Sequence, residues 1–234
     1  MSSNNRFLAL RLEGPLQSWG FDSQYSRRNT GLLPTKSAIA GMCCAALGYS
    51  RGCNEEGFFL AQFSKLHMTA IAIPREGIRK ALPVRRLQDY HTVQNTRTAK
   101  GDLKDCHITH RQYLTDAAFG VILEGDNDFL SKIVQALADP KWGIWLGRKT
   151  CVPTAPVLAD VKMNSGELFC LLKETRDEAL KLLIGDKELK SFTYQADVDD
   201  FTDGRDAIPD TPISFAIEKR LFSPRRIFTH NGRN

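Results

Sequence analysis

The residues best suited to acid–base chemistry gather in one basic segment of the chain. His91, His107 and His110 lie there, close to Tyr90 and Lys104. Ribonucleases that use no metal need such a set: one group deprotonates the 2′-hydroxyl, another protonates the leaving oxygen, and a cation stabilises the phosphorane. No regular spacing joins these residues, and side chains of these types also bind RNA passively or pack inside proteins. We therefore keep a metal-independent endoribonuclease as one candidate function of the protein.

The stretch TGLLPTKS (30–37) resembles a phosphate-binding P-loop but departs from it. That motif requires glycine where Thr30 and Thr35 stand, because glycine lets the backbone wrap a triphosphate. We therefore exclude nucleotide hydrolysis. A weaker expectation is that free N–H groups at the start of the following helix, with Lys36 and Ser37, bind one phosphate. The alternative is an ordinary helix cap.

The remaining composition excludes several classes of site. There is no HExxH or GxSxG motif and no carboxylate cluster suited to Mg²⁺, so we expect neither a metal site nor a cofactor. The six cysteines form no CxxC pair and no zinc spacing with histidine, which indicates reduced thiols of a cytosolic protein. No apolar run reaches the roughly 18 residues of a membrane span, and no signal-peptide core follows the N-terminus. We therefore expect a cytoplasmic protein with no membrane partner.

Charge is distributed unevenly along the 234 residues, whose net charge is +5. Between Arg75 and Arg111, nine Lys or Arg stand against four acids, so this stretch alone carries +5. The last sixteen residues, from Lys219, contain five cations and no acid, whereas 197–210 contains six Asp and one Arg. A basic insertion, a basic tail and the basic stretch YSRRNTG (25–31) together favour an RNA or DNA partner. For each run alone, a solvated face is the alternative.

Hydrophobic patterning and chain breakers predict the order β-α-β-β-α-β, which is typical of a ferredoxin-like fold. The predicted strands are 6–13, 66–74, 116–125 and 142–146, and the predicted helices are 34–48 and 126–140. An insertion at 75–115 separates the second and third strands, and loops of that length are usually functional. Beyond residue 150 the pattern predicts strands at 166–174 and 212–222, a helix at 176–188 and an acidic loop at 196–206. The fold class is thus α+β: a ferredoxin-like domain at 1–149, and a smaller β-rich region at 150–234 packed on it.

The insertion is expected to form an arm. Its large apolar residues are few and spread out, so it cannot build a core of its own. The polar stretch NTRTAKGD (95–102) is expected at its tip.

Two loops beside the predicted strands could contact a nucleotide. In LRLEGPLQSWG (10–20) the first strand is expected to break at Gly14, which would place Trp19 in an exposed loop. Stacking of a base on Trp19 would contribute about 1–3 kcal/mol; the alternative is that Trp19 plugs the core beneath the loop. In GRKTCVP (147–153) a glycine and two cations follow the fourth predicted strand, where backbone and charge could approach a nucleotide together.

Taken in order, several segments resemble the CasD-type (Cas-five) subunits of type I-E Cascade, the CRISPR RNA-guided surveillance complex. The resemblance runs from the first strand to the tail, with gaps mainly at 50–65 and 175–210. Its more specific motifs are LRLEGPLQSWG and the GRKTCVP loop. The supporting segments are TGLLPTKSAIAGMCCAALG, LQDYHTV, THRQYLTDAAFGVIL, LGRKTCVPTAPV and FSPRRIF.

This resemblance implies a fold and a function. Members of the family have a ferredoxin-like domain with a long inserted β-hairpin, the thumb, and cap the 5′ end of the CRISPR RNA (crRNA) by holding its repeat-derived handle. They contact the repeated backbone subunit and the large subunit that reads the target's flanking motif, so target DNA is met only through the complex. In type I-E a separate subunit cuts the precursor. Type I-C relatives cut it with a Tyr, Lys and His set, which does not align onto particular residues here.

We therefore expect a non-catalytic crRNA-binding subunit. The alternatives are a metal-independent endoribonuclease that processes precursor crRNA, and a scaffold that binds protein only. Phosphate contacts are expected above all from Arg27, Arg28, Lys36, Arg148 and Lys149. The full set of expected RNA-binding residues adds Gly14, Gln17, Trp19, Ser37, Arg85, Arg86, His91, Arg97, Lys100, Arg111, Gly147, Arg225 and Arg226.

Overall fold

The computed structural model describes residues 4–20, 22–23, 26–76, 81–82, 84–98, 100–159, 171–204 and 206–232. The first half of these residues forms β1 (Asn5–Gln17), β2 (Arg27–Arg28), α1 (Lys36–Leu47), α2 (Asn54–Phe63), β3 (His67–Ile73), β4 (Arg75–Glu76), β5 (Ala81–Leu82) and β6 (Arg85–Arg97). The second half forms β7 (Leu103–Asp126), α3 (Asn127–Ala138), β8 (Leu172–Lys173), α4 (Arg176–Ile184), a short 3-10 helix (Leu189–Ser191), β9 (Tyr194–Asp197), β10 (Asp206–Ser214) and β11 (Leu221–His230).

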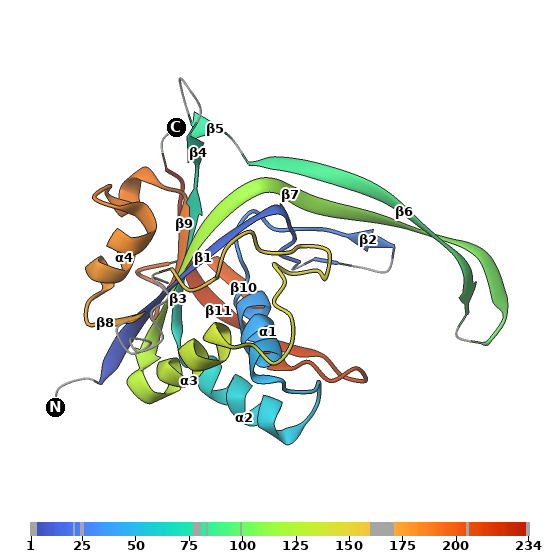
Figure 1. The fold of residues 1–234 in the computed structure, drawn as a ribbon, viewed down its shortest axis with the longest axis horizontal. Coiled ribbons are helices and arrows are strands. Elements are labelled where there is room, and N and C mark those ends of the chain that lie inside the picture. The colour runs from blue at the N-terminus through green and yellow to red at the C-terminus, as the bar shows by residue number, and fades with distance from the viewer. Residues whose placement is uncertain are drawn as a thin grey trace.

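Most of the described strands form one mainly antiparallel sheet with helices on both faces (Figure 1). The strand order is β10-β11-β9-β3-β7-β1-β8, and β2 and β6 pair with the far half of β7. The helices α1, α2 and α3 bury their apolar side chains in the larger core on one face. The helix α4 covers a smaller core on the other face. The mixed α and β class predicted from the sequence is therefore confirmed.

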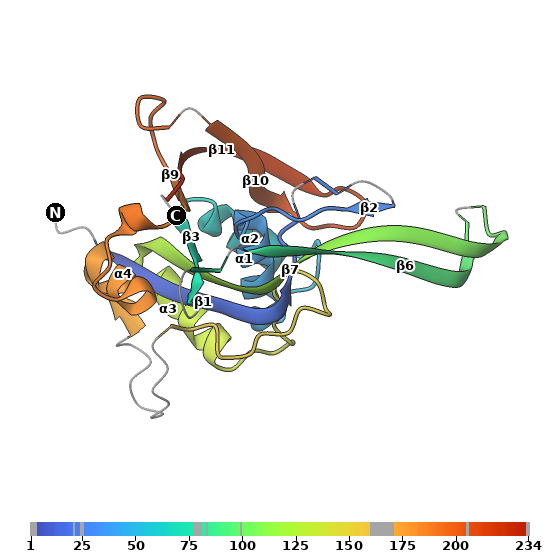
Figure 2. The same ribbon diagram turned by 90° about the horizontal axis from the view of Figure 1, so that it is seen from above.

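The 24-residue strand β7 connects the body to a projecting hairpin. Its C-terminal half lies between β1 and β3, where Leu123 is opposite both Leu8 and Met68. Its N-terminal half pairs with β6 in one antiparallel register as far as Arg97, with a gap in the pairing at Asn95. The expected insertion thus includes a long hairpin that continues a strand of the body (Figures 1 and 2).

The fourth strand predicted at 142–146 is wrong. The backbone N–H groups of Lys141 and Trp142 donate to the last carbonyls of α1, at Ala46 and Ala45, with N···O distances of 2.9 and 3.2 Å. Because these donors cap the helix, this part of the chain does not pair in the sheet. It forms an irregular loop instead.

A later segment of the chain runs along the edge of β1 that does not pair with β7. The N–H of Arg11 donates to Val157 O at 2.8 Å, and the N–H of Ala159 donates to Ala9 O at 3.1 Å. Beyond this segment, β8 pairs with the start of β1. Residues 154–159 therefore lie along the edge of β1, and residues 142–146 do not.

The first strand does not break at Gly14. β1 continues to Gln17, with Leu16 opposite Thr115 on β7. Pro15 is exposed and lies between paired positions, so its missing N–H removes no bond of the ladder.

Local signals placed the helices well. The helix predicted at 34–48 is α1: Thr35 Oγ1 accepts from the N–H of Ala38, and Gly48 ends the helix at φ 73°. The helix predicted at 126–140 is α3, where the Asp126 carboxylate accepts from Asp128 and Phe129. The helix predicted at 176–188 is α4, which ends earlier, and α2 was not predicted.

The C-terminal strands extend the same sheet beyond β3. The strand predicted at 212–222 is wrong, because β10 ends at Ser214, β11 begins at Leu221, and the residues between them form the turn of a hairpin. The acidic stretch 196–206 runs from the end of β9 to the start of β10. Of the strand predicted at 166–174, residues 166–170 lie outside the described residues.

Candidate nucleic-acid interface

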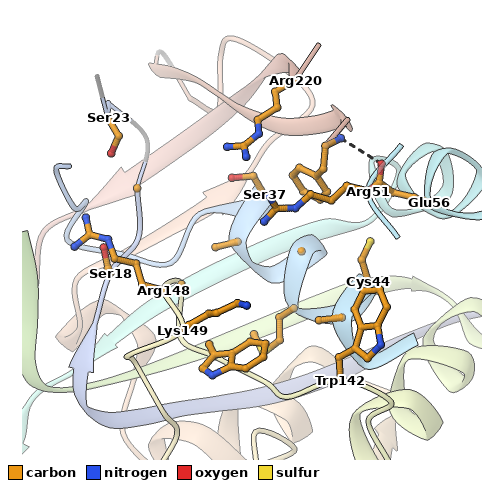
Figure 3. Close-up of a pocket in the computed structure, with 18 of the residues that line it drawn as sticks. Ser18, Ser23, Ser37, Cys44, Arg51, Glu56, Trp142, Arg148, Lys149 and Arg220 are labelled. Carbon is orange, nitrogen blue, oxygen red and sulfur yellow. Dashed lines mark hydrogen bonds between the residues drawn. The ribbon is translucent and has the colours of Figure 1, made fainter. Parts of the chain in front are cut away.

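A cleft of about 770 Å³ opens beside α1 (Figure 3). One wall comes from the β1–β2 connection and the loop at 142–149, and the opposite wall comes from the β10–β11 turn. In Figure 3, Ser37 of α1 lies between Arg220 on one side and Lys149 on the other. Segments from both ends and the middle of the chain therefore meet at one concave surface.

Positive charge converges on this cleft. Its lining residues include five cations, Arg28, Arg51, Arg148, Lys149 and Arg220. They include one carboxylate, Glu56, which is only 1% exposed and accepts hydrogen bonds from the backbone N–H groups of Gly52 and Phe215. The excess of cations favours an anionic ligand with several charges, such as a phosphate backbone.

Aromatic rings lie among these cations. Trp142 is 46% exposed, which is unusual for so large an apolar side chain. The Nζ of Lys149 lies 5.8 Å from the centroid of the Trp145 ring. On the opposite wall, the rings of Phe215 and Phe222 pack edge to face at 6.2 Å. Cations interleaved with accessible rings are typical of sites that bind single-stranded nucleic acids.

Arg148 holds the wall of the cleft together. Its guanidinium donates to Gln112 O at 2.9 Å and to Arg28 O at 2.7 Å. It also lies 4.7 Å from the centroid of the Tyr113 ring. Arg148 therefore fixes β2 and β7 beside the loop that carries Lys149, in addition to bringing charge to the cleft.

Two predicted glycines allow close approach between chain segments. Gly147 has φ +99°, and a Cβ there would lie 1.8 Å from the carbonyl oxygen of Ser18. At Gly14 a Cβ would lie 2.8 Å from Val152 O. Gly14 is buried, so its expected contact with RNA is wrong; Gly147 is exposed at the rim of the cleft, where its expected contact stays a prediction.

The β6–β7 hairpin carries a second group of predicted residues. It projects away from the helices and the C-terminal strands (Figure 2). Four of its cations are exposed, and Arg111 is half-buried with its Nε donating to Thr109 Oγ1. The exposed four are Arg85, Arg86, Arg97 and Lys100. Arg27 is exposed on β2, which pairs with β7 at the base of the hairpin.

The candidate acid–base residues do not converge. Alternation along β6 and β7 puts His91 and His107 on one face of the hairpin, and Tyr90 and His110 on the other. The rings of Tyr90 and His110 are 5.3 Å apart, whereas His91 Nδ1 lies 3.8 Å from Asp89 Oδ2. The side chain of Lys104 lies outside the described residues. The set proposed for catalysis therefore divides into two separate groups.

Two residues expected in the exposed loop are buried. Trp19 has no exposed surface, and its ring packs edge-on against Phe119 at 6.2 Å. Gln17 is also fully buried, and its side-chain amide donates to Leu12 O and Ala117 O. Stacking of a base on Trp19 and direct RNA contact by Gln17 are therefore wrong, because the strand carries both side chains into the core.

The phosphate site expected at the start of α1 is already occupied by a carboxylate. The backbone N–H of Lys36 donates to Asp210 Oδ2 at 2.8 Å. The Lys36 side chain is 3% exposed, and its Nζ lies 3.0 Å from Asp197 Oδ2. Burial lowers the pKa of Lys36, against the opposing effect of Asp197. Lys36 is therefore not available to an RNA phosphate, whereas Ser37 still lines the cleft.

The two arginines predicted on β11 are engaged within the protein. The Arg225 guanidinium, which was expected to bind RNA, is instead buried against Asp197 and Asp210. Arg226 donates to Asp199 O and lies 3.5 Å from the centroid of the Phe201 ring. An RNA contact by Arg226 would have to displace these contacts.

Several residues of the cleft were not predicted from the sequence. Arg51 follows the end of α1, and Arg220 lies in the turn that was mistaken for a strand. Trp142 was assigned to a strand, which hid its exposure. The signal available was a basic residue in the loop that follows the helix-ending Gly48, as at Arg51.

Other kinds of site find no support in the described residues. Among them, no group of three or more His, Cys, Asp or Glu side chains could hold a metal ion. None of their helices is long and apolar enough to cross a membrane.

Comparison with known proteins gives consistent matches. A family model described as CRISPR-associated protein (Cas_Cas5) matches residues 7–229. The CRISPR system Cascade subunit CasD of Escherichia coli (strain K12) is 32% identical over 156 residues, which cover 64% of this chain and 69% of that protein.

Two solved structures are similar over nearly the whole chain. A chain of a CRISPR RNA-guided surveillance complex superposes with a TM-score of 0.70 and 28% identity, covering 95% of this chain and 88% of that one. A structure described as a Cas protein gives a TM-score of 0.63 and 27% identity, covering 95% and 93%.

Proposed function

Because the chain belongs to the CRISPR-associated Cas5 family, we propose that it is the subunit of a CRISPR RNA-guided surveillance complex that binds the 5′ handle of the crRNA. The cleft beside α1 is the main RNA site. The observation that carries this proposal is the convergence of five cations and several accessible rings on one concave surface. Phosphates would contact the cations while unstacked bases contact the rings.

The β6–β7 hairpin is the second element of the proposal. It would lie between the RNA and neighbouring subunits, since it combines exposed cations with exposed apolar side chains. Tyr90 is 60% exposed and Leu103 70% exposed. Apolar side chains at this level of exposure on a projecting arm favour a protein partner. The partners are the repeated backbone subunit and the large subunit, and target DNA is met through the assembled complex.

The proposal includes a ferredoxin-like core. β1, β3 and β7 would supply three of its strands, and residues 154–159 would take the place of the fourth. In this division residues 1–149 hold three strands of the core and its hairpin, and residues 150–234 supply the segment in the fourth position and the C-terminal strands that complete the cleft.

RNA recovered with the protein tests the function. The chain is co-purified with the proteins encoded beside it, and the 5′ ends of the bound RNA are sequenced. We expect uniform ends that begin in one repeat-derived handle. Absence of RNA would favour the protein-only scaffold.

Two variants test whether the cleft is the RNA site. Arg28→Ala, Lys149→Ala and Arg220→Ala combined should reduce the recovered RNA strongly, because the three residues are exposed cations of the cleft. Arg226→Ala should leave the recovery unchanged, because its guanidinium is already bonded within the protein. Equal recovery from both variants would move the RNA site away from the cleft.

We further propose that the subunit is not catalytic. Its candidate acid–base residues divide between the two faces of a hairpin, so His91 and His107 cannot act on the same phosphodiester as Tyr90 and His110. Purified protein should leave repeat RNA intact, with or without EDTA. Site-specific cleavage that His91→Ala, His107→Ala or His110→Ala abolishes would establish the endoribonuclease instead.

A further inference from the structure

One wall of the cleft is carried by a hairpin at the edge of the sheet. Phe215, Arg220 and Phe222 line the cleft from the β10–β11 turn and the start of β11. Among the described strands, β10 is the outermost, so its ladder bonds run only to β11. Besides the ladder between β11 and β9, the position of this wall depends on contacts between the hairpin and the helices beneath it.

The first of these contacts is a buried ion pair at Asp210 of β10. Asp210 is 2% exposed and faces Arg225 of β11 in a two-pronged contact, with Nε to Oδ1 at 2.6 Å and Nη2 to Oδ2 at 3.0 Å. The same Oδ2 accepts from the backbone N–H of Lys36 at 2.8 Å. One carboxylate therefore joins both strands of the hairpin to the first residue of α1.

A second carboxylate completes the cluster. Asp197 of β9 contacts Arg225 through Oδ1, and its Oδ2 accepts from Lys36 Nζ and from the N–H of Met68, both at 3.0 Å. Two cations and two carboxylates thus balance in a buried site that links α1, β3, β9, β10 and β11. The guanidinium is matched on two sides by carboxylates, which is the geometry in which buried ion pairs are well satisfied.

A third carboxylate fixes the turn. Glu56, in the first turn of α2, is 1% exposed. Its Oε2 accepts from the N–H of Phe215 at 3.3 Å and from the N–H of Gly52 at 2.9 Å. Figure 3 shows the contact with the turn as a dashed line beside the cleft. The hairpin is therefore held midway along its strands by Asp210 and at its turn by Glu56.

We propose that Asp210 and Glu56 are positioning residues for RNA binding: they hold the β10–β11 wall at the distance from Lys149 and Trp145 that the cleft requires. The inference rests on the proposed function of the cleft. Both carboxylates are buried and bonded within the protein, so they act through Phe215 and Arg220 rather than by touching RNA. Removing the charge of Asp210 leaves two buried cations against one carboxylate, and the strain falls on the hairpin rather than on the opposite wall.

The test compares RNA affinity with local opening of the hairpin. Asp210→Asn keeps the shape of the side chain and removes its charge. Binding of fluorescein-labelled oligouridine is measured by anisotropy, and amide hydrogen exchange is measured over 206–222. We expect the Kd to rise about tenfold and exchange to accelerate in the hairpin, with little change in α3 or α4.

The control variant is Leu183→Ala in α4, which opens a cavity in the core on the other face of the sheet. It should lower the melting temperature at least as far as Asp210→Asn while leaving the Kd unchanged. If Asp210→Asn does not fold, Glu56→Gln replaces it, since the ion cluster stays whole; the expected rise in Kd is then about threefold. A wild-type Kd together with accelerated hairpin exchange would overturn the inference.

The two measurements distinguish a failure of the proposed RNA-binding function from a failure of the positioning role. If the wild-type protein does not bind oligouridine and no RNA accompanies the complex, the RNA site is not the cleft and the role in RNA binding falls with it. The exchange measurement still decides whether the carboxylates position the hairpin. Selective acceleration over 206–222 supports that role, and uniform acceleration across the sheet contradicts it.

Discussion

Two hairpins of this protein carry similar basic sequences in opposite surroundings. The β6–β7 hairpin projects from the body, and Arg85, Arg86, Arg97 and Lys100 are exposed along it. The β10–β11 hairpin lies against the helices, and its Arg225 is buried between two carboxylates. The first hairpin leaves these four cations exposed to solvent, and in the second hairpin a buried arginine joins parts of the protein.

The difference shows what makes a basic run a binding surface. The carboxylates that engage Arg225 come from the acidic stretch at 197–210, which lies close by in sequence. The acids within the insertion are fewer than its cations, so its net charge persists in the fold. A basic run beside an acidic run therefore points to internal pairing, and a basic run without one points to a surface that can attract phosphate.

The largest expected effect is a difference in the free energy of unfolding between a variant of the buried Arg225 and a variant of the exposed Arg97. Arg225→Ala leaves Asp197 and Asp210 buried without their shared cation, so unfolding free energy should fall by about 3–5 kcal/mol. Arg97→Ala removes an exposed side chain and should change it by less than about 0.5 kcal/mol. Urea denaturation of both variants provides the measurement.

Similar losses for the two variants would contradict this contrast. Arg225→Lys sharpens it, because a lysine keeps the charge but cannot make the two-pronged contact with Asp210. We expect this variant to lie between the wild-type protein and Arg225→Ala.

The second effect concerns the far end of the β6–β7 hairpin. Replacing 94–104 by a short Gly-Ser turn removes residues that are mostly exposed, so the melting temperature should stay nearly unchanged. Assembly of the complex on RNA should weaken, because Arg97 and Lys100 are lost together with the exposed Leu103. Calorimetry and a gel-shift assay with the partner subunits measure the two parts. Unfolding of the shortened protein would show that this end belongs to the core.

The hairpin also shows which parts of the fold the sequence could predict. Helix caps at Thr35, Gly48 and Asp126 were read correctly because their signals lie within a few residues of each other. The insertion was read correctly as an arm because charge and scarce apolar residues are local properties. The base of this arm was not predicted correctly, because Tyr113 and Leu114 belong to the expected insertion but are buried in the main core.

Burial of polar and aromatic residues could not be predicted in the same way. Lys36 is paired with Asp197, 161 residues away, and its N–H with Asp210, 174 residues away. Such pairing depends on the tertiary fold.

Trp19 and Trp142 were misplaced for one reason: the extent of a strand decides which ring is buried, and the strand boundaries at Gly14 and 142–146 were wrong.

The third effect compares exposed cations from the two hairpins. Arg97→Ala and Arg220→Ala should each lower the slope of log Kobs for RNA against log salt by roughly 0.7, the value for one phosphate contact on a single strand. Arg226→Ala should leave the slope unchanged, since Phe201 and Asp199 O already engage its guanidinium. Titrations at several salt concentrations give the slopes. A slope that Arg97→Ala does not alter would remove the first hairpin from the RNA path.

The smallest expected effect is a difference in alkylation rate between two cysteines, which compares the projecting hairpin with the docked one. Cys106 is exposed on the β6–β7 hairpin, whereas Cys44 lies in α1 beneath the β10–β11 turn. Burial, reinforced by the charge of Glu56, raises the pKa of the Cys44 thiol to about 12. At pH 8 only about one Cys44 in 10⁴ is then a thiolate, so iodoacetamide should modify Cys106 first.

Mass spectrometry of the alkylated peptides measures both rates. Glu56→Gln should make Cys44 more reactive, because removing the carboxylate lowers the pKa of the thiol and loosens the turn above it. Arg97→Ala should leave the ratio of the two rates unchanged. If Cys44 in the wild-type protein reacts as fast as Cys106, the β10–β11 wall opens readily in solution, and the contrast between a docked and a projecting hairpin does not hold.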